Sequence, residues 1–143
     1  MVLGSFMITL KELISDEFYK EAPIDYHINL AKLLTKLNEF REAYGKPLRV
    51  TSGYRSMKHH LEIYAKKGIT DQSKIPMKSN HLFGLAADLV PIEDDIRHLH
   101  DWVWDNIKLM EELNLYFEAL SYTPTWLHVQ CVAPKSGNRF FIP

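Results

Sequence analysis

The sequence predicts an α+β domain in which a small, mostly antiparallel sheet is flanked by helices. Segments with helical periodicity alternate with short runs of β-branched and apolar residues. The last two of these runs lie close enough in the sequence to form a hairpin. A chain of 143 residues, 46% of them hydrophobic, can build one core of ordinary size. We therefore expect a single domain over residues 7–143.

The N-terminal segment is expected to contribute one helix. Met7 reads as a natural start, so residues 1–6 are interpreted as a possible expression scar. Thr9 and Glu12 have the spacing of a capping box, in which each residue satisfies a backbone N–H of the other. They predict a first helix that continues until Pro23.

The next segment is predicted to hold two helices separated by a strand. Asp25 is expected to cap a strongly amphipathic helix that ends at Gly45. Residues 48–51 have the β-branched and apolar character of a short strand. Ser56 then caps a helix over residues 57–67.

The second half is predicted to supply most of the sheet. Residues 68–80 show no periodicity and form a loop long enough to suggest a functional rim. Asp94 is expected to cap one long helix that continues to Leu113, and the tail after Pro134 has no regular signal. The predicted strands are residues 85–90, 116–121 and 126–132.

Composition excludes several classes of function. Seventeen Lys and Arg against eighteen Asp and Glu give a net charge of −1, so no basic field favours nucleic acid or a membrane surface. No apolar run approaches the roughly 18 residues that span a bilayer, and no export signal is visible. The single cysteine, Cys131, cannot form an internal disulfide. We expect a monomer that is made in the cytoplasm without a signal peptide.

Side chains of the last strand are expected to alternate between two faces, because successive residues of a strand point in opposite directions. The apolar face carries Leu127, Val129 and Cys131, and the opposite face carries Trp126, His128 and Gln130. Cys131 is therefore expected in the core, and an imidazole emerges from the other face of the sheet.

Asp88 lies on a predicted strand among small residues, where an unpaired carboxylate would cost several kcal/mol to bury. A divalent cation shared with His81 and His128 removes that cost, and zinc accepts these ligand types. Either histidine taken alone is more often a hydrogen-bonded structural residue. The positions that together favour the metal are Ser79, His81, Gly84, Ala86 and Asp88.

The pattern Ser-x-His-x-x-Gly-x-Ala-x-Asp, followed by a strand with Trp-x-His, resembles the D-Ala-D-Ala carboxypeptidase family of zinc peptidases. That family shares its fold with the hedgehog signalling domain and includes phage L-alanyl-D-glutamate endolysins. The resemblance implies one Zn²⁺ per chain, with His81, Asp88 and His128 as its ligands. It also implies that Arg55, in the segment 51–56, faces the substrate near the metal.

The resemblance leaves the general base open, because many family members carry a glutamate where this chain has Thr125. Glu118 is the nearest upstream carboxylate, and the hairpin could bring it alongside the metal as the base. A solvated glutamate on an edge strand is the alternative. Tyr122 is expected to stabilise an oxyanion, and Ser79 either contacts the substrate or forms a turn.

The remaining histidines are poorer candidates for chemistry. His98 and His100 point to different faces of a predicted helix, whereas His59 and Glu62 share a face but lack a third ligand. We expect all four at the surface.

These observations predict a zinc peptidase that cleaves an amide bond in peptidoglycan stem peptides, of the DD-carboxypeptidase or the L-Ala-D-Glu endopeptidase type. The absence of an export signal suits a phage lysin that acts on the cell wall once released, and a bacterial cell-wall hydrolase is the nearer alternative. From another class, the domain could be a zinc-stabilised binding or virion structural module without catalysis. Thr125 is the best support for that alternative.

Overall fold

The structure, a computed structural model, describes residues 7–143, so the interpretation of residues 1–6 lies outside the described residues. The α-helices are α1 (Leu10–Leu13), α2 (Asp16–Glu21), α3 (Ile24–Tyr44), α4 (Met57–Lys66), α5 (Ile96–Asp105) and α6 (Ile107–Leu113). Two short 3₁₀ helices are η2 (Gln72–Lys74) and η3 (Asn80–Phe83). Within residues 7–143, none of the helices has the length and apolar character needed to cross a membrane.

The strands are β1 (Leu48–Ser52), β2 (Ala86–Pro91), β3 (Tyr116–Glu118), β4 (Leu127–Gln130) and β5 (Phe140–Phe141). They form one sheet in the order β1-β2-β4-β3-β5. Every pair is antiparallel except β3 and β5, and β3 and β4 form the expected hairpin. The predicted α+β class with a small, mostly antiparallel sheet is therefore confirmed.

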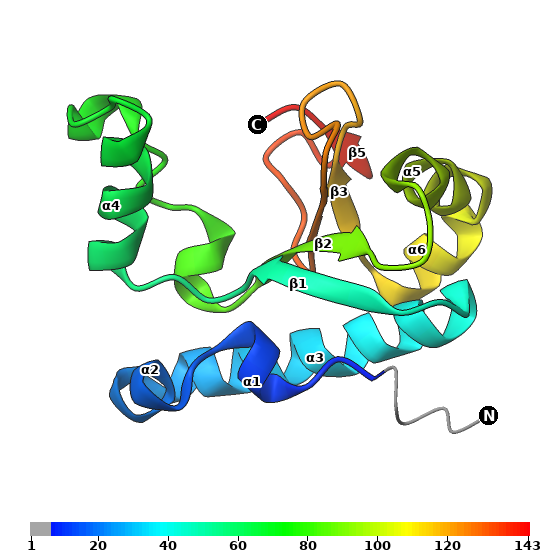
Figure 1. The fold of residues 1–143 in the computed structure, drawn as a ribbon, viewed down its shortest axis with the longest axis horizontal. Coiled ribbons are helices and arrows are strands. Elements are labelled where there is room, and N and C mark those ends of the chain that lie inside the picture. Colours follow the sequence, from blue (N-terminus) through cyan, green and yellow to red (C-terminus); the bar gives the residue numbers. More distant parts are fainter. Residues whose placement is uncertain (1–6) are drawn as a thin grey trace.

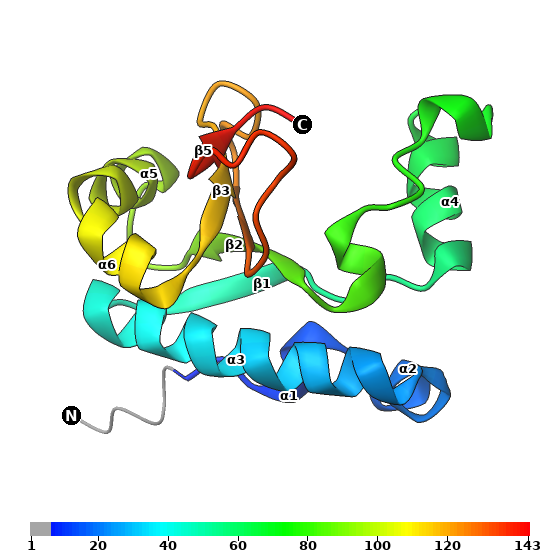
Figure 2. The same ribbon diagram turned by 180° about the vertical axis from the view of Figure 1, so that it is seen from behind.

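The helices cover one face of the sheet and leave the other face to loops. In Figures 1 and 2, α3 runs along the sheet beneath β1 and β2. Helices α5 and α6 lie together on one side of the molecule, and α4 stands apart from the sheet on the opposite side. The buried core joins these helices to alternate residues of the strands. Its fully buried strand residues are Ala87, Leu89, Phe117, Leu127 and Val129.

Cys131 is also part of this core, as the alternation of side chains predicted. The residues between the core positions point to the opposite face, where Asp88, His128 and Gln130 are buried polar side chains. Each fully buried Leu of the core contributes roughly 1.5–3 kcal/mol of transfer free energy, which the polar face cannot supply. One face of the sheet therefore holds the fold together, and the other is available for chemistry.

Helix boundaries differ from the sequence predictions in two places near the N-terminus. The capping box forms, with Glu12 Oε2 accepting from Thr9 N at 2.9 Å, but the helix stops at Leu13. Ser15 starts the second helix, because its hydroxyl accepts a hydrogen bond from the backbone N–H of Phe18. The single predicted helix is therefore two short ones.

The N-cap residue of the long helix α3 is Pro23 rather than Asp25, and Asp25 lies in the first turn, where it complements the helix dipole. The helix ends as predicted at Gly45, whose φ of 79° lies in the left-handed region.

The predicted helix from Asp94 to Leu113 is also divided. Asp95, not Asp94, caps α5. Asn106 ends α5, and its side-chain amide donates to the carbonyl of Trp102 at 2.8 Å. That local hydrogen bond competes with the helical ladder, so α6 starts anew at Ile107.

The C-terminal tail is not irregular, because Phe140 and Phe141 form β5 beside β3. The backbone N–H of Phe117 donates to Arg139 O at 2.8 Å, and that of Ala119 donates to Phe141 O at 2.8 Å. A strand of two residues is too short to show a periodicity in the sequence, which is why the prediction missed it.

Candidate metal centre

The sheet brings polar residues from distant segments into one row. In the antiparallel registers, Ser52 of β1 lies opposite Asp88 of β2, and Asp88 lies opposite His128 of β4. Residues directly opposite each other in a sheet share a face. The β3–β4 register pairs Phe117 with Val129, so the next pair along the strands would place Glu118 beside His128. The separation of Glu118 Oε1 from His128 Nδ1 is 3.7 Å, which agrees with that placement.

His81 reaches this row from η3, which directly precedes β2. Gly84 ends η3 with a φ of 72°, a left-handed conformation that glycine adopts without strain. A Cβ at Gly84 would also lie 2.9 Å from Leu30 Cγ and 3.1 Å from Tyr26 O. Only glycine therefore satisfies both the backbone conformation and the packing at this turn, which brings His81 beside Asp88.

Gly53 fixes the orientation of His81. The carbonyl of Gly53 accepts a hydrogen bond from His81 Nδ1 at 2.9 Å, and the backbone N–H of Arg55 donates to His81 O at 3.0 Å. A Cβ at Gly53 would overlap the backbone of Leu13. Glycine is needed here because β1 passes so close to α1.

The three predicted ligands converge. One ligand atom each from His81, Asp88 and His128 lie within 4.8 Å of one another, and all three residues are buried. Asp88 Oδ1 is 3.3 Å from His81 Nε2 and 3.0 Å from His128 Nδ1. Two imidazoles and one carboxylate form the donor set of many catalytic zinc sites, which keep a further coordination position open.

The protonation of His81 indicates that this group fits a cation. The Gly53 carbonyl can only accept, so His81 Nδ1 carries the proton and its Nε2 presents a lone pair to Asp88. Burial lowers the pKa of the His81 imidazole, despite the nearby Asp88 carboxylate. A lone pair facing a carboxylate oxygen is repulsive unless a positive ion lies between them. A metal bound there would remove the repulsion.

Asp88 and His128 have pKa values that shift in opposite directions. Burial alone would raise the pKa of Asp88, but the hydrogen bond with His128 holds that pKa well below its usual range. Burial opposes a charge on His128, but its hydrogen bond with Asp88 and the Glu118 carboxylate raise the pKa above the ordinary value. The carboxylate is therefore ionised at neutral pH and ready to coordinate a cation.

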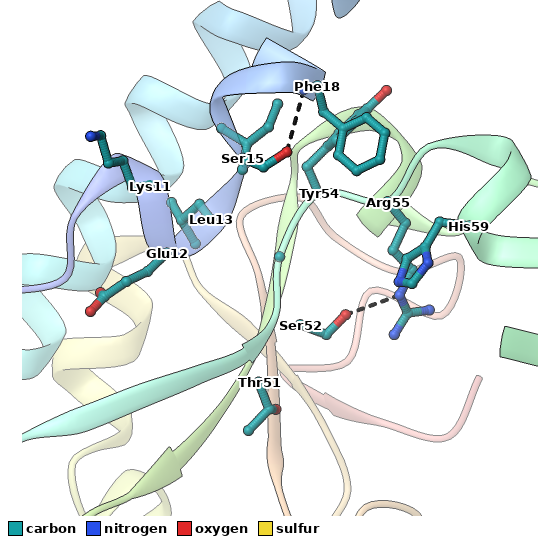
Figure 3. A pocket seen from close by; sticks show the side chains of 12 residues that line it. Lys11, Glu12, Leu13, Ser15, Phe18, Thr51, Ser52, Tyr54, Arg55 and His59 are labelled. Atoms are coloured by element: carbon teal, nitrogen blue, oxygen red, sulfur yellow. Dashed lines mark hydrogen bonds between the residues drawn. The ribbon is translucent and has the colours of Figure 1, made fainter.

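Arg55 lies beside the ligands, where the sequence predicted it. Its Nε donates to Ser52 Oγ at 3.0 Å, and a terminal nitrogen lies 3.5 Å from Asp88 Oδ2. The two oxygens of Asp88 are thus divided between the histidines and Arg55. Figure 3 shows the guanidinium reaching toward Ser52 in a pocket of about 210 Å³, which His59 also lines. One charged group therefore connects the metal ligands to a solvent-accessible pocket.

Glu118 also lies at the site rather than on a solvated edge. Its side chain is 14% exposed, and burial raises the pKa of its carboxyl, with a further increase from the charge of Asp88. Thr125 is exposed in the turn before β4. The structure thus brings one glutamate to the ligand group, from β3 and not from the position of Thr125.

The two other predicted substrate contacts lie outside the strands, in the segments that precede η3 and β4. Ser79 is the N-cap residue of η3, two residues before His81, and its side chain makes no capping hydrogen bond. Tyr122 lies in the connection between β3 and β4 and is 51% exposed. No hydrogen bond joins either side chain to the ligands among the residues that the structure describes, and their contact with a substrate stays a prediction.

The prediction that His100 lies at the surface is wrong, whereas His59, Glu62 and His98 are exposed as expected. His100 Nε2 lies 3.1 Å from Thr123 O and 2.9 Å from Trp126 O, so one buried N–H satisfies two carbonyls of the β3–β4 connection. The spacing of His100 from the buried Val103 carried this signal, since residues three apart share a helix face.

Sequence reasoning also missed His60 and Gln130. His60 is fully buried on α4, and its Nε2 donates to Pro76 O at 3.0 Å, which ties the loop before η3 to that helix. Gln130 was placed on the correct face but given no role, and its Oε1 accepts from His128 Nε2 at 2.8 Å. The alternation of β4 was the signal for Gln130; nothing in the sequence marks His60.

Comparison with solved structures finds the same fold at a TM-score of 0.50. VanYB in complex with D-alanine-D-alanine is 22% identical, with a TM-score of 0.50 over 77% of this chain and 73% of that chain. A mutant of the vancomycin resistance D,D-pentapeptidase VanY from a VanB-type resistance cassette, in complex with Zn(II), is 22% identical, with a TM-score of 0.47 over 73% of this chain and 72% of that chain. No curated protein matches the chain.

The family is shown by a sequence comparison. The family model of peptidase M15 matches residues 7–107 of this chain, which is more than half of its 143 residues. The match includes His81 and Asp88 and ends before the hairpin that carries Glu118 and His128. It confirms the family predicted from the motifs, and zinc is the ion that fits the ligand group. The chain therefore belongs to the peptidase M15 family and is a zinc metallopeptidase.

Proposed function

We propose that this protein hydrolyses an amide bond in peptidoglycan stem peptides, as a DD-carboxypeptidase or an L-Ala-D-Glu endopeptidase. The observation that carries the proposal is a buried group of two histidines and one aspartate with Arg55 and Glu118 directly beside it. Membership of the peptidase M15 family supports the reaction class. The dipeptide bound by VanYB guides the choice of the first substrate to test.

The ligand group would hold zinc through His81, Asp88 and His128. When bound, zinc supplies a Lewis acid that polarises the scissile carbonyl and makes a water molecule more acidic. The protein contributes the fixed geometry, because each ligand side chain is buried and each histidine makes a hydrogen bond through its other ring nitrogen.

Glu118 is proposed as the general base. Its carboxylate accepts a proton from the attacking water and returns a proton to the leaving amine as the amide bond breaks. Burial raises the pKa of Glu118, which favours a carboxyl that both accepts and releases a proton. Its position on β3, next to His128, places it where the water would be activated.

Arg55 is proposed to orient the substrate. Its planar guanidinium can donate two parallel hydrogen bonds to a carboxylate or to a polarised carbonyl. Ser52 and Asp88 contact the guanidinium, and Arg55 also lines the pocket in Figure 3. Ser79 and Tyr122 are proposed to contact the peptide from the loops that flank the ligands.

The biological setting that we propose is cell-wall degradation, by a monomeric phage lysin or a bacterial wall hydrolase. Either enzyme would be made in the cytoplasm and would act on the wall after release. Neither nucleic acid nor insertion into a membrane enters this proposal.

The deciding experiment is digestion of purified sacculi by the zinc-loaded protein, with and without a chelator. Mass spectrometry of the products separates loss of a terminal D-alanine from cleavage between L-alanine and D-glutamate. A synthetic pentapeptide that ends in D-Ala-D-Ala, compared with the tetrapeptide, gives the same distinction in solution. We expect zinc-dependent release of one product class, and His98→Ala, which changes an exposed histidine, should retain full activity.

The alternative outcome is equally specific. Zinc-loaded protein that binds sacculi but releases no product would favour a zinc-stabilised binding module. Thr125, at the position where many relatives carry the catalytic glutamate, is the observation that favours this second candidate. Release of product by the wild type would exclude it.

A further inference from the structure

Gln130 is a buried polar residue that the proposed chemistry does not use. It lies two residues after His128 on the same face of β4 and is 3% exposed. Its Oε1 lies 2.8 Å from His128 Nε2, and its Nε2 lies 2.9 Å from Val132 O. Both ends of the side-chain amide are therefore satisfied, one by a ligand of the metal and one by the backbone.

The backbone decides which way the amide points. A carbonyl oxygen only accepts hydrogen bonds, so the NH₂ group of Gln130 must face Val132 O. The amide oxygen then faces His128 and can only accept. It follows that His128 Nε2 carries a proton and that Nδ1 is the ring nitrogen directed toward Asp88.

The two histidine ligands consequently use opposite ring nitrogens. His81 donates from Nδ1 to the carbonyl of Gly53, which leaves its Nε2 for the metal. His128 donates from Nε2 to Gln130, which leaves its Nδ1 for the metal. A backbone acceptor orients the first ligand, whereas the second depends on a side chain that can be changed by mutation.

We propose that Gln130 is a positioning residue, which keeps the proton of His128 on Nε2 and thereby presents Nδ1 to zinc. The inference rests on the zinc site of the proposed function and adds a residue that acts through a ligand. Partners of this kind fix the tautomer and orientation of the ring and raise its basicity as a ligand. Losing one typically weakens metal binding by about ten- to a hundredfold.

A variant tests the proposal through metal affinity rather than through peptidase activity. Gln130→Met keeps the length of the side chain but removes the acceptor, so His128 Nε2–H is left buried without a partner. We expect the zinc dissociation constant, measured by competition with a chromophoric chelator, to rise by about ten- to a hundredfold. We also expect an altered absorption spectrum of the Co²⁺-substituted protein.

The matched control is Thr123→Val. Thr123 is fully buried in the connection before β4, and its hydroxyl has no hydrogen-bond partner among the described residues. Thr123→Val therefore replaces a polar side chain by an apolar one away from the ligands, and the zinc affinity of this variant should stay within twofold of the wild type. Zinc affinity of Gln130→Met within twofold of the wild type would overturn the inference.

A second measurement needs no variant and so does not depend on how Gln130→Met folds. Long-range ¹H–¹⁵N correlation spectra of the zinc-loaded wild type distinguish the two histidine tautomers. We expect a protonated Nε2 and a coordinated Nδ1 for His128, and the reverse for His81. Coordination of His128 through Nε2 would overturn the inference.

The outcomes separate this inference from the proposed function. Zinc bound with the expected tautomers, but no product from peptidoglycan, would contradict the proposed function alone. Product formation with His128 coordinated through Nε2 would contradict the role of Gln130 alone. A wild type that binds no zinc would overturn both.

Discussion

Two carboxylates six residues apart in the sequence, Asp88 and Asp94, have similar electrostatic states and different uses. Their side chains are 11% and 10% exposed. The pKa of each is held well below its usual range, for Asp88 by a hydrogen bond with His128 that outweighs burial, and for Asp94 first by a hydrogen bond from Tyr44. A depressed pKa alone therefore does not identify a metal site.

The partners of the two carboxylates make the difference. Asp94 joins the end of α3 to the start of α5. Each of its partners either donates a hydrogen bond to the carboxylate or is exposed to solvent. These partners are the Tyr44 hydroxyl, the Lys46 ammonium, the exposed His98 imidazole and the backbone N–H of Asp95. Asp88 instead faces the lone pair of a buried, neutral His81. The lone pairs of Asp88 Oδ1 and His81 Nε2 face each other with no proton between them, so this group, unlike that of Asp94, needs a cation.

The largest effect is expected from a matched pair of substitutions at these two positions. Asp88→Asn should abolish stoichiometric zinc and peptidase activity, because the amide is a poor ligand and cannot balance the ion. Asp94→Asn should keep one zinc per chain and full turnover. Elemental analysis of both purified variants provides the measurement.

The histidine ligands give an independent check on the same site. His81→Ala and His128→Ala should also lose stoichiometric zinc and any lytic activity. Stoichiometric zinc retained by both histidine variants would show that the ligand assignment is incorrect.

The next effect concerns the base. Glu118→Gln removes the proton acceptor but keeps the shape of the side chain, so zinc content and fold should persist while turnover falls by about a hundredfold or more. Thr125→Ala is the control, since an exposed threonine cannot accept a proton at neutral pH, and it should cost less than roughly tenfold. Wild-type turnover in Glu118→Gln would remove Glu118 from the mechanism.

A smaller effect is expected at Arg55. Arg55→Lys keeps the positive charge near Asp88 but loses the planar fork, which reaches Ser52 and Asp88 together. Activity should fall by roughly tenfold or more with zinc content intact. Kinetic constants for a defined stem peptide, beside metal analysis, provide the test; unchanged constants would leave Arg55 as a partner of Asp88 only.

The alternation of residues made most of the fold predictable from the sequence. Core and site faces of β2 and β4 followed directly from the period of two, as Leu127 and His128 illustrate. The breaks at Ser15 and Asn106 were not predicted, because a side chain that hydrogen-bonds its own backbone competes with a helix only when packing permits. Strand β5 was missed because it depends on pairing with β3 and not on local sequence.

The convergence of His81, Asp88 and His128 was predictable because their residue types and spacing are rare in combination. What spacing cannot provide is the ring nitrogen that each histidine uses, since that depends on Gly53 O for His81 and on Gln130 for His128. The hydrogen-bond partners of His100 were likewise hidden, although its helical spacing from Val103 indicated burial, because they are backbone carbonyls of a loop 23 and 26 residues away. Contacts of this kind leave no pattern in the sequence.

The smallest expected effect is a pH-dependent change in stability at Asp94, which distinguishes it from Asp88 without involving a metal. The pKa of Asp94 is lower in the folded protein than the ordinary value of 3.8, so its ionised form stabilises the fold above that pH. That stability is lost as the pH falls from the ordinary pKa through the folded pKa. Asp94→Asn should therefore lower the Tm by a few degrees at pH 7, and the difference from wild type should shrink below about pH 4.

Asp101→Asn is the control for this last comparison, because Asp101 is 59% exposed and its ion pair with Arg97 spans 3.7 Å on the helix surface. Its Tm should match the wild type at both pH values. The comparison is made by thermal unfolding of zinc-free protein, so that metal binding at Asp88 does not contribute to the Tm. A Tm difference for Asp94→Asn that is equal at pH 3 and pH 7 would mean that Asp94 stabilises the junction of α3 and α5 through packing. A Tm difference that decreases in acid would show that the negative charge of Asp94, which interacts with Tyr44 and His98, stabilises this junction.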